Sequence, residues 1–169
     1  MKKVIQVSII LTLVIFTACQ KSIPEDQKLM NEIDQLISQN AFDQALEKCN
    51  IILNKFPESK YVMKANLEIG KFYHSKAISG MDENKQLQEA VNHYLKVYNN
   101  YPDSSISEQA LFHAGFILAN ELQMYDSAKV IYNRFIEAYP ESQLAQPVKY
   151  ELQNLGITPD QILEMNRKN

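Results

Sequence analysis

Apolar residues recur along most of this chain with the spacing of one face of an α-helix. From about residue 27 to the end, large apolar side chains return every three or four positions, as at Met30, Ile33 and Ile37. No run of useful length alternates apolar and polar residues in the manner of a β-strand. Prolines at positions 57, 102 and 140 each end a helix, because the residue before proline is disfavoured in the α conformation. The pattern predicts an all-α protein.

The first eighteen residues follow a different pattern from the rest of the chain. Lys2 and Lys3 precede the stretch Val4–Ala18, which has 15 residues and no charge. A membrane-spanning helix needs about 20 apolar residues, so this stretch is short for one. It ends in the small residues before Cys19, and this order is typical of a secretory signal peptide. Residues 1–18 are therefore predicted to be a signal peptide that is removed, with an uncleaved membrane anchor as the alternative.

Three segments of the chain share one ending and several internal offsets. Each ends in an aromatic residue, a proline, an acidic residue and a serine, and the prolines are Pro57, Pro102 and Pro140. Gly70 and Gly115 stand thirteen residues after the first two prolines. An alanine stands twelve residues before each proline, and a large apolar residue stands three before each alanine. The alanines are Ala45, Ala90 and Ala128, and the apolar residues are Phe42, Leu87 and Tyr125.

These offsets resemble the tetratricopeptide repeat, a helical hairpin of 34 residues. In that pattern the glycines take position 8, the large apolar residues position 17, the alanines position 20 and the prolines position 32. The prolines here lie 45 and 38 residues apart, and the longer unit carries a turn-like insertion at Ser79–Asn84. Two interpretations of this insertion remain: a tolerated surface insertion and a contact specific to the family. The resemblance implies a right-handed superhelical solenoid over residues 27–169, with about three helical hairpins and a C-terminal capping helix.

Two further signals predict helix starts. Ser105 with Glu108, and Thr158 with Gln161, fit the pattern in which two side chains three residues apart cap each other's backbone N–H groups. The second pair predicts a short last helix, which suits a solenoid because its terminal repeat needs a polar cap.

The residues before Cys19 resemble the lipobox of bacterial lipoproteins, and the longer repeat spacing resembles the BamD-like and Tol-Pal-associated repeat lipoproteins of the Gram-negative envelope. The resemblance implies that the Cys19 thiol is acylated and that residues 19–26 form a lipidated tether. An ordinary secretory signal, without acylation, is the alternative. Gln20 stands where an aspartate commonly retains such proteins at the inner membrane. The resemblance therefore implies a lipid anchor in the outer membrane, with the protein facing the periplasm.

Charge limits the classes of partner. Loss of Lys2 and Lys3 with the signal peptide leaves 15 basic residues against 20 acidic ones, a net charge of −5. Nucleic acids and anionic surfaces are bound through clustered cations, which this chain lacks. The sequence predicts no nucleic-acid partner.

Few residues are candidates for catalysis. His74, His93 and His113 occupy different repeat positions, and their spacing predicts no metal site. Cys49 replaces a repeat aromatic, which predicts a buried, unreactive thiol. The sequence has no glycine-rich phosphate loop and no nucleophile elbow. It therefore predicts no enzyme, no cofactor and no metal.

The resemblance also implies that the first helix of each hairpin lines a binding groove, through positions 2, 5, 9 and 12 or 13. Phe112 and Phe116 are four residues apart and form a candidate anchor for a peptide, with burial in the core as the open alternative. The candidate groove residues are Lys64, Leu67, Lys71, His74, Gln109, Phe112, Phe116 and Asn120.

The hypothesis that follows is a lipid-anchored periplasmic adaptor that binds an envelope protein or peptide. Outer-membrane protein assembly is one candidate pathway for it. Two alternatives stay open: a module whose groove binds peptidoglycan or a small ligand, and a self-associating structural spacer.

Overall fold

The computed structural model describes residues 23–158, 160–161, 164 and 167. In this part of the chain the regular structure is helical and no strand is present, which confirms the all-α prediction. The predicted signal peptide and Cys19 lie outside the described residues. None of the helices in the described ranges is long and apolar enough to cross a membrane.

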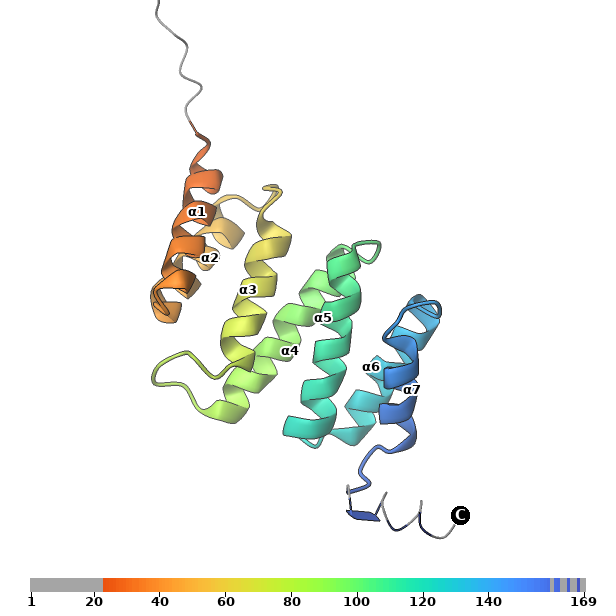
Figure 1. The fold of residues 1–169 in the computed structure, drawn as a ribbon. Helices are drawn as coiled ribbons and strands as arrows, with labels where there is room; N and C mark the ends of the chain where they lie inside the picture. Colours follow the sequence, from red (N-terminus) through yellow and green to blue (C-terminus); the bar gives the residue numbers. More distant parts are fainter. Residues whose placement is uncertain (1–22, 159, 162–163, 165–166, 168–169) are drawn as a thin grey trace, which may run out of the picture.

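The helices of residues 23–158 form three hairpins and one further helix (Figure 1). Each helix packs mainly against the helix before it and the helix after it. The odd-numbered helices lie side by side in one layer, as Figure 1 shows. Their bounds and those of their partners are α1 Glu25–Ser38, α2 Phe42–Lys55, α3 Val62–His74, α4 Glu83–Asn100, α5 Ser105–Phe116, the π-helical turn η1 Ile117–Glu121, α6 Tyr125–Ala138 and α7 Ala145–Gln153. The predicted solenoid is thus confirmed, and its first helix begins two residues inside the segment assigned to the tether.

All three hairpin turns begin with a residue in the left-handed conformation. Asn40, Lys76 and Gln123 have φ values of 56°, 56° and 53°. Such a residue reverses the chain directly after a helix, usually as glycine, and here as longer polar side chains. The three hairpins therefore reverse direction with the same backbone conformation, although the hairpins differ in length.

The layers meet where a tyrosine ring lies on a glycine. A Cβ atom on Gly70 of α3 would lie 2.9 Å from Cε1 of Tyr94 on α4. A Cβ atom on Gly115 of α5 would lie 2.5 Å from Cε1 of Tyr132 on α6. Both rings are buried, so neither has room to move away. The recurrent glycines thus allow close helix packing, as their shared offset predicted.

Cys49 occupies the tyrosine position in the first hairpin. It is fully buried, and burial raises the pKa of its thiol to about 12. A thiol that stays protonated is a poor nucleophile, because the thiolate is the reactive form. The predicted core position of Cys49 is confirmed.

In two of the three proline-acid-serine links, the serine bonds back to the first helix of the hairpin before it. Ser59 and Ser142 accept a hydrogen bond from the backbone N–H two residues further on. The same hydroxyls donate to Asp26 and Glu108, which lie in the first turns of α1 and α5. The link therefore returns to the start of the hairpin that it leaves.

One predicted helix cap is wrong and the other is confirmed. Ser104, not Ser105, caps α5 by accepting the Ile106 N–H at 3.3 Å, because Glu108 is engaged by the following link. Thr158 N–H donates to Gln161 Oε1 at 2.9 Å, and Gln161 N–H donates to Thr158 Oγ1 at 3.4 Å. This reciprocal pair is the predicted capping box.

The insertion in the second hairpin is an ordered loop between α3 and α4. The buried Gln86 donates from Nε2 to the carbonyls of Ile78 and Met81, both at 3.0 Å. Its Oε1 accepts the Ile78 N–H at 3.1 Å. Ser79 N–H also donates to Asp43 at the start of α2, at 3.0 Å. The insertion is thus held by specific bonds and lengthens α4 to 18 residues, against 14 in α2 and α6.

The third hairpin accommodates a single extra residue inside a helix. Gly115 and Tyr125 are ten residues apart, where the repeat pattern has nine between positions 8 and 17. At this point the helix widens into η1, in which Leu122 N–H donates to the Ile117 carbonyl at 2.9 Å. A bond between residues five apart defines a π-bulge, the usual way in which a helix absorbs one more residue.

Replacing Gly115 with alanine is expected to destabilise the fold by about 1–3 kcal/mol, because its methyl group would overlap the buried Tyr132 ring. At an unhindered helix position the same change stabilises by about 1 kcal/mol. Chemical denaturation of the variant measures the sign directly. Gly70→Ala is the matched comparison and should cost less, since its contact is looser. A stabilised Gly115→Ala protein would show that the ring does not lie where it is described.

Candidate functional site

The candidate groove residues lie on the surface formed by α1, α3, α5 with η1, and α7, called here the odd-helix face. Polar contacts across this face join each odd-numbered helix to the next. Lys64 of α3 bonds to Asp34 of α1 at 2.8 Å, and His74 of α3 contacts Glu121 of η1 at 2.7 Å. Asn120 of η1 in turn donates to Glu151 of α7 at 3.3 Å. Lys64, His74 and Asn120 therefore share one face.

An apolar row crosses the same face. Leu67 stands ten residues after Pro57, and Phe112 stands ten residues after Pro102. Both are partly buried against the larger core cluster and partly open to solvent. The two alternatives for Phe112 thus combine, because one part of the ring packs inward and another faces outward. Its ring centroid lies 6.3 Å from that of Phe116, which is also partly exposed.

Tyr150 of α7 extends this row and was missed in the sequence. It stands ten residues after Pro140, the offset shared by Leu67 and Phe112, and 54% of it is exposed. The spacing carries this signal, although the last helix is predicted from the sequence only as a cap. The apolar row therefore consists of Leu67, Phe112 and Tyr150, one residue from each of three successive odd-numbered helices.

A cleft of about 380 Å³ opens beside the row, between α3 and α5. Lys71, His74, His113 and Ser75 line it together with Tyr94. The rings of Tyr94 and His113 stack with centroids 5.5 Å apart, and those of His74 and His113 meet edge to face at 5.8 Å. His74 and His113 come from different helices and line the same cleft, although their repeat positions gave no reason to expect this.

The environment of the cleft changes the pKa of His113. Burial lowers its pKa, and the positive charges of His74 and Lys71 lower it further. Lys71 is itself paired with Glu68 at 3.0 Å, one turn earlier on the same helix. The cleft therefore holds His113 in its neutral form at neutral pH.

The π-helical turn supplies a residue that sequence reasoning did not identify. Glu121 contacts His74 Nε2 through Oε1 at 2.7 Å and Lys76 Nζ through Oε2 at 3.5 Å. Lys76 also approaches Glu83, at 3.6 Å, across the insertion loop. One carboxylate thus ties the end of the third odd-numbered helix to the end of the second and to the insertion.

His93 is a structural residue below this face. Asn66 donates from Nδ2 to the Val62 carbonyl at 3.0 Å, so its Oδ1 faces His93 Nδ1 at 2.9 Å. His93 Nδ1 must carry the hydrogen in this pair, because Oδ1 only accepts. Burial lowers the pKa of His93 to about 4, with a further contribution from Lys96. The histidine is therefore a neutral, buried part of the core.

The remaining candidates carry no catalytic arrangement. Gln109 is exposed on α5 and Cys49 is buried away from the face. In the residues that the structure describes, no three or more His, Cys, Asp or Glu side chains are placed to hold a metal ion. The odd-helix face therefore consists of an apolar row with polar contacts around it.

Residues 109–142 match the tetratricopeptide-repeat family. The matched segment contains most of α5, all of η1 and α6, and the link after Pro140. The chain is therefore a protein that contains a tetratricopeptide repeat, within an all-α solenoid. Repeats of this class generally mediate protein–protein interaction, and scaffolds of this kind are typically non-catalytic. A comparison with curated proteins gives no match.

The stability of the protein is expected to fall as the pH drops from about 6.5 to about 4. The folded state holds the pKa of His93 near 4 against 6.5 for a free side chain. In this window the unfolded chain therefore binds a proton that the folded protein does not, which costs roughly 3 kcal/mol of stability by pH 4. Urea denaturation at several pH values measures the effect. His93→Gln should flatten this part of the profile, and an unchanged slope in that variant would assign the effect to other groups.

Proposed function

We propose that this chain is a lipid-anchored adaptor of the cell envelope that holds an extended segment of a protein partner on its odd-helix face. The apolar row of Leu67, Phe112 and Tyr150 supports this most directly. Each residue comes from the same offset in a successive repeat unit, and each leaves apolar surface open. Partly buried aromatic residues in a groove are typical anchors of a protein interface.

The arrangement of the row suits an extended peptide. Its members come from one odd-numbered helix after another, so a segment that crosses these helices meets them in turn. An extended chain advances about 3.3 Å per residue, which lets a short segment reach from one helix to the next. A partner with apolar side chains spaced along such a segment fits the face.

The charges around the row are already paired within the protein. Lys64 pairs with Asp34, and Lys71 pairs with Glu68. The partner is therefore selected by the apolar row and its surrounding hydrogen bonds rather than by a net charge of the central face. This agrees with interfaces in general, which place apolar contacts at the centre and polar contacts at the rim.

The envelope part of the proposal rests on the N-terminal sequence. The basic start, the uncharged stretch Val4–Ala18 and the following Cys19 support export and acylation. An acylated Cys19 would hold the solenoid close to the outer membrane, facing the periplasm. An accessory role in outer-membrane protein assembly suits an adaptor in that place.

A glycan-binding groove receives less support. Its tyrosines would have to offer their ring faces to a sugar, and Tyr94 and Tyr132 are instead buried on the glycines. The repeat uses these rings for packing.

Phe112→Ala and Tyr150→Ala should each reduce capture of the membrane-derived partner about tenfold or more, the usual cost of losing an interface anchor. Affinity capture from solubilised membranes with quantitative mass spectrometry compares them with the wild-type protein. Val130→Ala is the matched control, because Val130 is 56% exposed and lies on α6. Equal capture by all four proteins, with unchanged helix content by circular dichroism, would contradict binding on the odd-helix face.

Acylation is tested by growth with a labelled fatty acid. The wild-type protein should carry the label and fractionate with outer membranes, whereas Cys19→Ser should carry none and lose membrane association. Cys49→Ser controls for the second thiol, which is buried. Label retained in the Cys19→Ser protein would rule out this anchor.

A further inference from the structure

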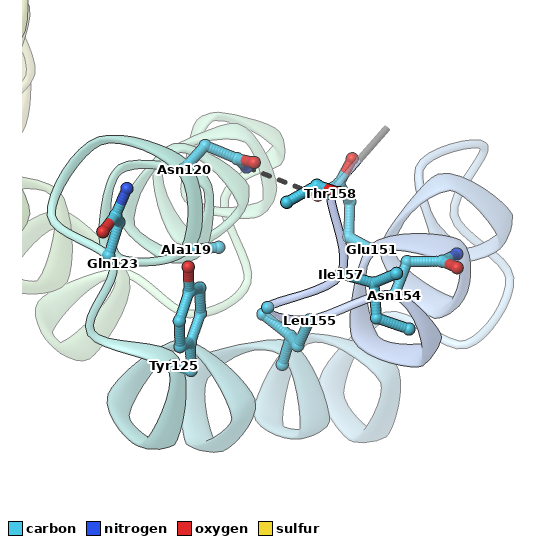
Figure 2. Close-up of a pocket in the computed structure, with 10 residues that line it drawn as sticks. Ala119, Asn120, Gln123, Tyr125, Glu151, Asn154, Leu155, Ile157 and Thr158 are labelled. Atoms are coloured by element: carbon cyan, nitrogen blue, oxygen red, sulfur yellow. Dashed lines mark hydrogen bonds between the residues drawn. The ribbon is translucent and has the colours of Figure 1, made fainter. Parts of the chain in front are cut away.

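A small pocket lies at the C-terminal end of the odd-helix face and takes no part in the apolar row. It has a volume of about 190 Å³ and lies between the end of η1, the start of α6 and the end of α7 (Figure 2). It is called here the C-terminal pocket. Its polar lining consists of Asn120, Gln123, Tyr125, Glu151, Asn154 and Thr158.

Several groups that face this pocket can accept hydrogen bonds. Asn120 Nδ2 donates to Glu151 Oε2 at 3.3 Å, and Asn154 Nδ2 donates to the Tyr150 carbonyl at 2.8 Å. Both amide side chains keep a carbonyl oxygen that can accept, and Glu151 has its second carboxylate oxygen as a further acceptor. The other polar side chains of the lining can both donate and accept. A ligand that brings several donors therefore finds acceptors here.

The charge of the pocket is negative. Glu151 contributes a carboxylate, and the described lining contains no lysine, arginine or histidine. The helices that contain η1 and α7 end here and α6 begins here, so the partial charges of these helix ends oppose one another and Glu151 sets the sign. Its effect extends to Tyr132, since burial raises the pKa of that hydroxyl and the Glu151 charge raises it further. The pocket therefore favours a cation over an anion.

Tyr125 adds an aromatic surface to the same pocket. It is 41% exposed, and Figure 2 shows its hydroxyl pointing up into the cavity toward the side that carries Asn120 and Thr158. A tyrosine ring attracts an ammonium group placed over its face. Carboxylate, carbonyl oxygens and ring together match the three N–H donors and single charge of a lysine side chain.

We propose that the C-terminal pocket binds the ammonium group of a lysine from the protein partner. This rests on the proposed function, because the α7 part of the pocket lining begins at Glu151, the residue after Tyr150, where the apolar row ends. The partner segment then carries its basic residue beyond the last of its apolar anchors. The pocket thus sets the direction in which the segment lies, since its carboxylate lies at the Tyr150 end of the row and Lys64 and Lys71 lie on α3 with Leu67.

Titration of the full-length protein in neutral detergent with N-acetyl-lysine methylamide tests the pocket without a partner. Backbone amide NMR shifts should saturate at Gln123, Tyr125 and Gly156. N-acetyl-norleucine methylamide, which has no charge, should bind at least about tenfold more weakly. Raising the salt concentration should weaken the lysine compound and leave the norleucine compound unchanged.

Glu151→Gln keeps the shape of the side chain and the bond from Asn120 but removes the charge. It should weaken binding of the lysine compound about tenfold. Glu137→Gln on the exposed surface of α6 is the matched control and should bind as the wild-type protein does.

Equal binding of the lysine and norleucine compounds, or no effect of Glu151→Gln, would overturn the proposal. So would saturable binding of N-acetylglucosamine at the same amides in place of lysine, since it would assign the pocket to a sugar. These results bear on the pocket alone. The proposed adaptor function fails separately, through unchanged partner capture by the Phe112 and Tyr150 variants.

Discussion

The contact between a tyrosine ring and a helix glycine sets the distance between the two helix layers. Tyr94 on Gly70 and Tyr132 on Gly115 leave no room for one added carbon atom. This contact keeps the odd-numbered helices in register, so that residues at equal offsets form rows across them. The Tyr94 ring also lines the cleft of His74 and His113, and so the same packing that builds the fold shapes part of its surface.

The first hairpin meets the same constraint with a different pair of residues. The repeat pattern places its glycine nine residues before position 17. In the first hairpin Ile33 stands at that place, nine residues before Phe42, and Cys49 stands where the other hairpins have tyrosine. Ile33 and Cys49 belong to one core cluster and are fully buried. A large residue on the odd-numbered helix thus accompanies a small one on its partner, and the interior keeps its volume.

The sequence predicted features that depend on local offsets and missed those that depend on contacts between repeats. Prolines, glycines and alanines at fixed intervals were sufficient for the hairpins, because each has a local conformational or steric effect. Glu121 could not be found in this way, since it contacts His74 across 47 residues and is positioned by η1. The choice between Ser104 and Ser105 as helix cap was also beyond the local pattern, because the link from Ser142 occupies Glu108. Tyr150 was within reach of the offset rule.

Successive odd-numbered helices are joined by side chains rather than by extensive packing. One polar contact bridges each neighbouring pair: Lys64 with Asp34, His74 with Glu121, and Asn120 with Glu151. The contacts of Lys64 with Asp34 and of Asn120 with Glu151 are exposed and contribute little stability, typically below about 1 kcal/mol each. The contact of His74 with Glu121 is partly buried. The face can therefore adjust its spacing at small cost when a partner binds, while the buried contacts with the other layer hold the solenoid together.

The π-helical turn shows how this solenoid accommodates one extra residue in a helix. A one-residue insertion in a helix ordinarily rotates everything after it by about 100°, which would turn a buried face toward solvent. Here the wider turn confines the change to Ile117–Glu121, and α6 still presents Tyr132 to Gly115. The solenoid thus holds one residue more than the repeat pattern and keeps the packing that follows it. Glu121, which contacts His74 of the second hairpin, lies in this turn, so the irregular segment also positions a contact between repeats.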